Sequence, residues 1–236
     1  MADREGWAGL LAEATAERAA QPQRICELCV EMLGVTGAGI SMATASGNRG
    51  VVCATDEVSA RIEDLQFTLG EGPCMDAVEA GTPVLVSDMQ QPGDVEVKRW
   101  PAFMEGAGST AARAVFAFPL RIGAIRVGAL DLYRDAPGDL ADDELSAALM
   151  AADAAALALL HLDAGRDKTF ADDQDARTTY QMQVHQATGM VQIQLGVTTA
   201  EALLMLRARA FADGRVLAHL ATDVVERRIR FAEEDP

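Results

Sequence analysis

The sequence lacks any apolar run close to the roughly 20 residues that a membrane-spanning helix requires, so we expect no membrane span. Its first six residues are charged and lead into no apolar signal core, which argues against secretion. Cysteine is scarce, and four residues do not make a disulfide framework in a chain of 236 residues. Half of the residues are hydrophobic, which is enough for a packed core. We therefore expect a soluble protein of the reducing cytoplasm.

Histidine is also scarce, and the three histidines are His161, His185 and His219. None of them lies in the first 160 residues, which excludes haem or zinc ligation through histidine in that part of the chain. The sequence contains no phosphate-binding glycine loop and no recognisable set of nucleophile, base and orienting residue. We predict no catalytic residues and no metal site.

Basic residues are outnumbered, 20 lysines and arginines against 36 acids, and the formal charge is −16. This charge repels polyanions, but it is unevenly distributed. Between residues 177 and 230, seven arginines face four acids, which leaves that segment at +3 and the remainder at −19. Because charges are screened over about 8 Å at physiological salt, the local sign matters more than the total. The asymmetry is typical of a basic binding module on an acidic protein, and solvated arginine-rich helix faces are the alternative.

The N-terminal two thirds of the chain combine short β-type runs with helical segments. The second helix is predicted to begin near Pro22, because proline is tolerated in a first turn, and Gly34 ends it. Two later strands flank a turn at Gly123, and a long Ala/Leu helix follows. Mixed elements with a tight turn between strands indicate an α+β domain on an antiparallel sheet. The expected helices are 5–20, 22–33, 58–67 and 142–162, and the expected strands are 39–44, 50–54, 83–87, 114–120 and 125–133.

One motif lies at the centre of this domain, Leu-Gly-Glu-Gly-Pro-Cys at residues 69–74. With this motif and this order of helices and strands, the segment 20–163 resembles a GAF domain, a small-molecule sensor related to PAS folds. The resemblance implies a pocket between the sheet and its covering helices. The signature residues of cyclic-nucleotide-binding members are absent, so the effector and any cofactor stay unidentified. The expected wall residues of the pocket are Cys74, Met75, Trp100 and Phe103.

The cysteines allow two interpretations each. Cys26 and Cys29 fall on the apolar side of a predicted helix, where buried thiols behave as small hydrophobic residues, and a redox or metal pair is the alternative. Cys74 follows Gly-Glu-Gly-Pro at a predicted helix N-terminus, where backbone amides can activate a thiol, although packing is the simpler role. A reactive Cys74 would favour a thiol-dependent enzyme on the GAF fold, such as a sulfoxide reductase.

The C-terminal quarter predicts three short helices. The first runs over 173–195 and ends at Gly196, where a left-handed residue is commonly needed. Thr198 and Glu201 form a predicted capping box, in which each side chain bonds the other residue's amide. Gly214 ends the second helix, and the third carries an apolar stripe. Three amphipathic helices of this length indicate one small bundle.

Four segments of these helices resemble, in order and spacing, the ANTAR domain, the RNA-binding module of bacterial antitermination regulators. They are Gln-Ala-Thr-Gly-Met at 186–190, Ala-Glu-Ala at 200–202, Leu-Arg at 206–207 and Arg-Val-Leu-Ala-His-Leu-Ala at 215–221. The resemblance implies a hairpin RNA as partner, since RNA loops are read through splayed bases and backbone. The implied RNA contacts are Gln186, Ala187, Thr188, Gly189, Arg207 and Arg215.

These implied contacts also have simpler interpretations. The two arginines would meet phosphate or bases, and the two small residues would permit close approach of the RNA. Helix packing is the alternative role for the small residues, and an ion pair with Glu201 or Asp223 is the alternative for Arg207. Thr188 stands where many family members have lysine, so one electrostatic contact is lost.

The sequence therefore predicts an α+β GAF-like sensor domain, with an antiparallel sheet and flanking helices, followed by an all-α three-helix ANTAR bundle. The expected boundaries are 1–163 for the sensor with its N-terminal helix, 164–175 for a linker and 176–236 for the ANTAR domain. The expected function is to bind hairpin RNA in nascent transcripts and prevent termination in response to a small-molecule effector. The helix at 145–162 could pair with its copy in a homodimer or pack within its own chain. A DNA- or protein-binding role for the bundle is the remaining alternative.

Overall fold

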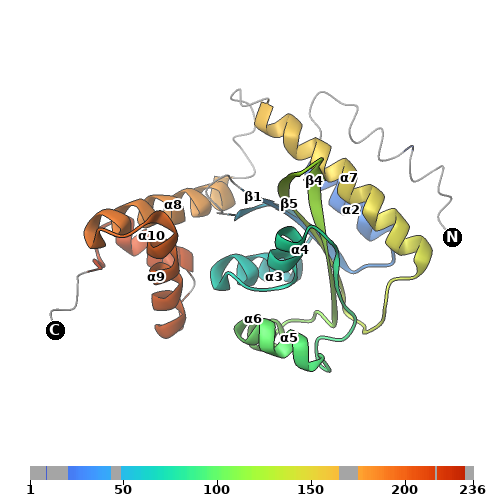
Figure 1. The fold of residues 1–236 in the computed structure, drawn as a ribbon, viewed down its shortest axis with the longest axis horizontal. Helices are drawn as coiled ribbons and strands as arrows, with labels where there is room; N and C mark the ends of the chain where they lie inside the picture. Colours follow the sequence, from blue (N-terminus) through green and yellow to red (C-terminus); the bar gives the residue numbers. More distant parts are fainter. Residues whose placement is uncertain (1–8, 10–20, 44–48, 165–174, 216, 232–236) are drawn as a thin grey trace. The chain divides into compact units, whose positions relative to one another are not determined.

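The computed structural model describes residues 9, 21–43, 49–164, 175–215 and 217–231 (Figure 1). The chain divides into two compact units, 1–166 and 167–236, and each unit is described by itself. The predicted helix at 5–20 and the predicted linker at 164–175 fall almost wholly outside the described residues.

The N-terminal unit is built on one antiparallel sheet with the strand order β2-β1-β5-β4-β3. This sheet confirms the predicted α+β class. β4 and β5 form a hairpin whose turn contains Gly123, at a φ of 61° that residues with a side chain rarely adopt. The strands lie close to their predicted positions, and β1 begins two residues earlier. They are β1 (Gly37–Ala43), β2 (Arg49–Ala54), β3 (Val84–Val86), β4 (Ala114–Ile122) and β5 (Ile125–Arg134).

Helices cover both faces of this sheet (Figure 1). One face packs against α2 and α7, and the other carries α3 and α4, with α6 packed against α3. Gly70, at a φ of 71°, ends α3, and Pro73 begins α4, so the Leu-Gly-Glu-Gly-Pro-Cys motif is the turn between these two helices. The helices are α2 (Pro22–Met32), α3 (Glu57–Leu69), α4 (Pro73–Ala80), α5 (Asp94–Arg99), α6 (Pro101–Ala107) and α7 (Asp142–Ala164).

The central strands contribute side chains to the packing on both faces of the sheet, because successive side chains of a strand point to opposite faces. Leu130 and Leu132 of β5 belong to the core cluster that β4 and β5 form with α2 and α7, together with Phe116 and Phe118. The residue between the two leucines, Asp131, therefore points to the face that α3 covers. This alternation places a carboxyl group inside the domain.

The long helix α7 is mainly a core helix. Ala152, Ala156 and Leu159 are buried within the unit, in the cluster that contains α2 and the sheet. Leu149, Leu157 and Leu160 of the same helix are exposed. Packing within its own chain, one of the two roles expected for this helix, therefore accounts for most of α7, and three leucines face outward.

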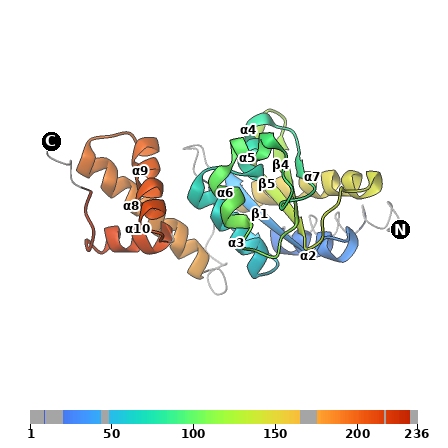
Figure 2. The ribbon, with the colours of Figure 1, turned by 90° about the horizontal axis from the view of Figure 1, so that it is seen from below.

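The C-terminal unit contains three helices (Figure 2), namely α8 (Asp175–Leu195), α9 (Thr199–Ala212) and α10 (Leu217–Val225). Their end signals are as predicted. Gly196 and Gly214 have left-handed φ values of 66° and 60°. The Thr198 hydroxyl accepts the Glu201 amide at 3.3 Å, and Glu201 accepts the Thr198 amide at 2.8 Å.

A continuous apolar core joins these three helices. Each helix contributes residues at helical spacing, so the predicted stripes are confirmed as the inner faces. No single described helix is long and apolar enough to cross a membrane. Residues 183–195 and 199–212 together have the length and composition of a membrane span, but the two helices are bent by 105° at the break between them. The buried apolar residues are Val184, Ala187, Val191, Ala202, Leu203, Leu206, Ala210, Leu217, Leu220, Ala221 and Val224.

Candidate functional site

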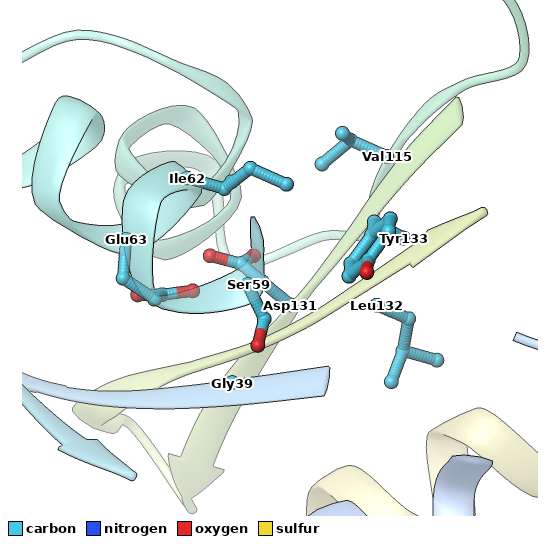
Figure 3. Close-up of a pocket in the computed structure, with 8 residues that line it drawn as sticks. All are labelled: Gly39, Ser59, Ile62, Glu63, Val115, Asp131, Leu132 and Tyr133. Carbon is cyan, nitrogen blue, oxygen red and sulfur yellow. The ribbon is translucent and has the colours of Figure 1, made fainter. Parts of the chain in front are cut away.

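The polar centre of the N-terminal unit lies between α3 and the sheet. Glu63 comes from α3, Asp131 from β5 and Ser41 from β1, and all three side chains are at most 4% exposed. Gly39 is the partner of Asp131 in the β1–β5 register, and a Cβ added at Gly39 would lie 3.0 Å from Glu63. The glycine therefore makes room for the Glu63 side chain, which reaches from α3 to the side of Asp131 (Figure 3).

Gln66 connects this centre to the motif at residues 69–74. Its Nε2 donates a hydrogen bond of 2.8 Å to Asp131 Oδ2, and its Oε1 accepts the Cys74 amide at 2.7 Å. Gly72, at a φ of 133°, comes so close that an added Cβ would lie 2.8 Å from Gln66. The two glycines of the motif thus allow α4 to begin directly against a buried polar side chain.

Burial governs the chemistry of the two carboxyl groups. It raises the pKa of Glu63 well above its ordinary value, and the nearby negative charge of Asp131 raises this pKa further. Ser41 opposes the shift in the pKa of Glu63, yet its hydroxyl is not in hydrogen-bond geometry with any described residue. Burial and the charge of Asp131 both favour the protonated form of Glu63.

Two narrow hollows meet at Glu63. The empty space in and around the first is about 170 Å³, and in and around the second about 210 Å³, with open solvent included. The first has no room for a water molecule, and the second has room for about one. Neither set of lining residues contains lysine, arginine or histidine. The first set is Gly39, Ser59, Ile62, Glu63, Val115, Asp131, Leu132 and Tyr133 (Figure 3), and the second is Ser41, Gly50, Val51, Glu63, Phe67, Cys74 and Met75.

Of the four expected pocket residues, two line a hollow at Glu63 and two pack elsewhere in the unit. Cys74 and Met75 line the second hollow. Trp100 and Phe103 line neither hollow and instead pack in a separate buried cluster with residues of α3 and α6. The Trp100 indole donates a hydrogen bond of 2.9 Å to Asp76, and the Phe103 amide donates one of 2.8 Å to Glu71. These two aromatic residues are therefore part of the hydrophobic core, and neither lines the two hollows at Glu63.

Sequence reasoning missed the acids at the centre of the site. A signal for Asp131 was present, since an acid stands between Leu130 and Leu132 in a predicted strand. An ionisable residue in the middle of an apolar strand is rarely fully buried without a partner. Nothing in the sequence distinguished Glu63 in this way, because acids are common on helices.

The thiols are buried throughout. None of the four cysteines, all of which are described, forms a disulfide. Burial raises the pKa of Cys29 to about 12. The hydrogen bond between Cys26 and Cys53, whose Sγ atoms lie 3.4 Å apart, raises the pKa of Cys26, and burial raises it further. Cys26 and Cys29 thus lie in the core as predicted, and no group of three metal-ligating side chains occurs among the described residues.

The expected RNA contacts of the C-terminal unit are partly inside the bundle. Ala187 is fully buried, and Thr188 is 1% exposed, with its hydroxyl donating to the Val184 carbonyl at 2.7 Å. The Thr188 side chain is therefore not on the surface, because it is hydrogen-bonded within its own helix. Gln186 is exposed, and space is open where Gly189 would carry a Cβ.

The arginines of this unit differ in how they are paired. Arg215 pairs with Asp223, whose pKa this arginine lowers, and Arg228 pairs with the same aspartate. Arg207 is half-buried. Of the two acids expected as its alternative partners, Asp223 pairs with Arg215 and Arg228, and Glu201 caps α9.

The remaining charged residues leave part of the surface cationic. Arg209 pairs with Asp213 at 2.8 Å. Arg227 and Arg230 are exposed, and neither forms an ion pair with a residue that the structure describes. The positive charge of the segment is thus partly neutralised around Asp223 and retained at the end of the third helix.

Comparison with known proteins identifies the N-terminal unit. The family model for the GAF domain matches residues 23–160. The GAF domain of an Acinetobacter phosphoenolpyruvate-protein phosphotransferase is 10% identical, with a TM-score of 0.54 over 72% of this chain and 100% of that chain. The corresponding domain from Coxiella burnetii is 15% identical, with a TM-score of 0.51 over 67% of this chain and 95% of that chain.

A third similar structure is the free methionine-R-sulfoxide reductase of Neisseria meningitidis in complex with its substrate. It is 12% identical and covers 70% of this chain and 95% of that chain, with a TM-score of 0.47. Similarities at this level of identity show the fold and nothing of the activity. No curated protein matches the chain.

Proposed function

This chain belongs to the GAF domain family, and from that premise we propose that it is a ligand-responsive regulator whose C-terminal unit binds hairpin RNA. In this proposal the GAF unit senses a small molecule in the hollows at Glu63. The three-helix unit acts as an ANTAR domain, and its contact with a nascent transcript prevents the terminator from forming.

The observation that carries the proposal is the C-terminal bundle itself. Its three helices, the capping box at Thr198 and the glycine stops at Gly196 and Gly214 occur where the sequence predicted them, and the segments that resemble ANTAR domains lie on or beside these helices. The exposed side chains of Arg227, Arg230 and Gln186 give the bundle groups that can recognise RNA backbone and unpaired bases. Because Thr188 is buried, we assign it to packing and assign the contacts to Gln186, Arg207, Arg215, Arg227 and Arg230.

Gel-shift titration with a pool of RNA hairpins, repeated over a range of salt, tests this proposal. Affinity should fall with a log–log slope of about −0.7 for each phosphate contact with single-stranded RNA. Arg227→Ala, which changes an exposed residue, should reduce both the affinity and the slope. Arg207→Ala should also weaken binding, with circular dichroism to verify that its helices remain folded.

Arg126→Ala is the matched control, because Arg126 is an exposed arginine of the GAF unit. This variant should bind RNA as the unchanged protein does. The proposal fails if no hairpin binds, or if Arg227→Ala and Arg126→Ala bind with equal affinity. Duplex DNA that competes as well as hairpin RNA would favour a DNA-binding role instead.

We also propose that the protein acts as a homodimer without catalytic activity. Leu149, Leu157 and Leu160 are exposed on one side of α7, with the exposed Asp153 among them, and this is a surface that a second copy can cover. Cys74 is 2% exposed, which does not favour a thiol enzyme. Ligand control then requires that the effector bind one dimer arrangement more tightly than another. Sedimentation equilibrium of Leu157→Glu should show a monomer.

A further inference from the structure

The thiols of Cys26 and Cys53 meet inside the GAF unit. Cys26 lies on α2 and Cys53 on β2, and their Sγ atoms are 3.4 Å apart in a weak hydrogen bond. Cys26 is fully buried and Cys53 is 3% exposed, within the core cluster that α2 and α7 form with the sheet. The sulfur atoms of a disulfide are about 2.05 Å apart. An approach of about 1.4 Å would therefore join these two sulfur atoms.

An irregularity of the sheet directs Cys53 towards α2. Ile40 of β1 lies opposite Cys53, and Ser41 lies opposite Val51, so Val52 is an extra residue in β2 and forms a β-bulge. Without the bulge, the alternation of side chains would place Cys53 on the same face as Val51, which lines the second hollow. With the bulge, Cys53 joins Ile40 in the core on the side of α2. The bulge thus brings the two thiols together.

The other two cysteines do not share this geometry. Cys29 follows Cys26 by one turn of α2 and is fully buried, but within the described part of the chain its sulfur is not hydrogen-bonded to either thiol of the pair. Cys74 lines the second hollow and packs with α4, on the opposite face of the sheet. These two cysteines therefore serve as internal comparisons for the pair.

The pair lies next to an edge of the sheet. β2 is the outermost strand, and no other described strand pairs with its outer side. Local opening of such a strand costs less free energy than unfolding of the whole domain, and it exposes Cys53 to small neutral molecules. The hydrogen bond with Cys53 and burial raise the pKa of Cys26, so the thiol form predominates at neutral pH and the reaction of the pair is slow.

We propose that Cys26 and Cys53 are a redox pair that hydrogen peroxide converts into a disulfide. The Cys53 thiolate attacks one peroxide oxygen, so an S–O bond forms, the O–O bond breaks and the released hydroxide takes up a proton to become water. Sγ of Cys26 then attacks the sulfenic acid, so the S–S bond forms, the S–O bond breaks and a second water leaves with the Cys26 proton. The two thiols lose two electrons, which reduce the peroxide to two molecules of water.

The disulfide links α2 to β2 and closes the chain between residues 26 and 53 into a loop. Such a link restricts the unfolded chain, so the oxidised GAF unit is the more stable form. Gly50 and Val51 of β2 line the second hollow, so the bond also holds one wall of that hollow in place. The inference goes beyond the proposed function, because neither the reaction nor the link depends on RNA binding.

Counting thiols by mass spectrometry tests the proposal. The folded full-length chain is treated with hydrogen peroxide, then denatured and alkylated with N-ethylmaleimide. The untreated protein should take up four labels, one for each cysteine, and the oxidised protein should take up two. Peptide mapping should locate the new bond between Cys26 and Cys53. Dithiothreitol should restore four labels, because a small dithiol reduces the disulfide by exchange.

Cys29→Ala is the matched control, since it removes a buried thiol of the same helix and should still form the bond. Cys26→Ala and Cys53→Ala should form no disulfide within the chain, with circular dichroism to verify that they remain folded. Without reductant, the oxidised unchanged protein should unfold several degrees above the reduced form, and its β2 amides should exchange more slowly. Cys26→Ala should show neither difference after the same treatment.

Four labels after a peroxide treatment that oxidises the urea-denatured chain would overturn the proposal, as would a bond that involves Cys29 or Cys74. A disulfide that still forms in Cys26→Ala would overturn it too. Equal unfolding temperatures and equal β2 exchange in the two forms would refute the link between α2 and β2. Peptide mapping uses the unchanged protein, so this result decides the proposal even if a variant does not fold.

Discussion

Replacing Glu63 by glutamine should stabilise the GAF unit, and the gain should grow with pH. Glu63 is 2% exposed and lies beside Asp131, so burial and like charge raise its pKa in the folded state. In the unfolded chain the pKa of a glutamate is about 4.3. Between these two values the folded protein holds a proton that the unfolded chain has lost. The free energy of unfolding therefore falls as pH rises from about 4.3 through the folded pKa.

The change in the free energy of unfolding with pH follows from the difference in bound protons between the folded and the unfolded state. Each unit by which the folded pKa exceeds the unfolded value removes about 1.4 kcal/mol of stability at a pH above both. Glutamine carries no titrating proton, so this cost is absent in Glu63→Gln. The amide can also donate a hydrogen bond to Asp131, which already accepts one from Gln66. The difference in stability between variant and unchanged protein should thus widen by about 1.4 kcal/mol per pH unit.

Urea unfolding followed by tryptophan fluorescence measures the difference, because Trp100 is buried in this unit. The titration should be repeated at several values between about pH 5 and pH 8. Glu79→Gln serves as the control, and its curve should run parallel to that of the unchanged protein. If Glu63→Gln runs parallel as well, or if its advantage shrinks as pH rises, Glu63 is ionised in the folded state and the reasoning is wrong.

Four further predictions concern single side chains. Thr198→Ala removes the capping box of α9 and should cost the C-terminal unit about 1 kcal/mol in thermal or urea unfolding by circular dichroism, whereas no loss would show that the cap is dispensable. Thr188→Val should leave hairpin binding in gel shifts unchanged, since its hydroxyl bonds only within its own helix; a clear loss of affinity would return this residue to the RNA surface. Asp223→Asn releases Arg215 and should raise RNA affinity and steepen its salt dependence, and weaker binding would show that the ion pair positions the arginine for RNA. Phe118→Ala, in the core between the sheet and α7, should cost about 3–5 kcal/mol by urea unfolding, and a cost below about 1 kcal/mol would contradict its full burial.

Local signals predicted the secondary structure well. The capping box at Thr198, the glycine stop at Gly196 and the proline start at Pro22 each act within one turn of a helix, so neighbouring residues in the sequence contain all the partners. For this reason most of the elements and their order followed from the sequence, whereas the two short helices α5 and α6 were not predicted.

Partners distant in the sequence could not be predicted in the same way. Glu63 meets Asp131 only because α3 folds over the β1–β5 pair and Gly39 leaves space between them. Trp100 and Phe103 have the composition of a pocket wall, but packing against α3 makes them core. Thr188 has a polar side chain that an RNA surface could use, and the bundle encloses it.

The sequence by itself determined the two-part organisation, the α+β class of the first part and the three amphipathic helices of the second, because periodicity and caps are local properties. Tertiary structure alone decided which acids are buried together and that Trp100 and Phe103 pack in the hydrophobic core. It also decided whether Arg207, Arg215 or Arg228 would pair with Asp223. Burial and electrostatic pairing depend on distances across the fold, and no spacing along the chain encodes those distances directly.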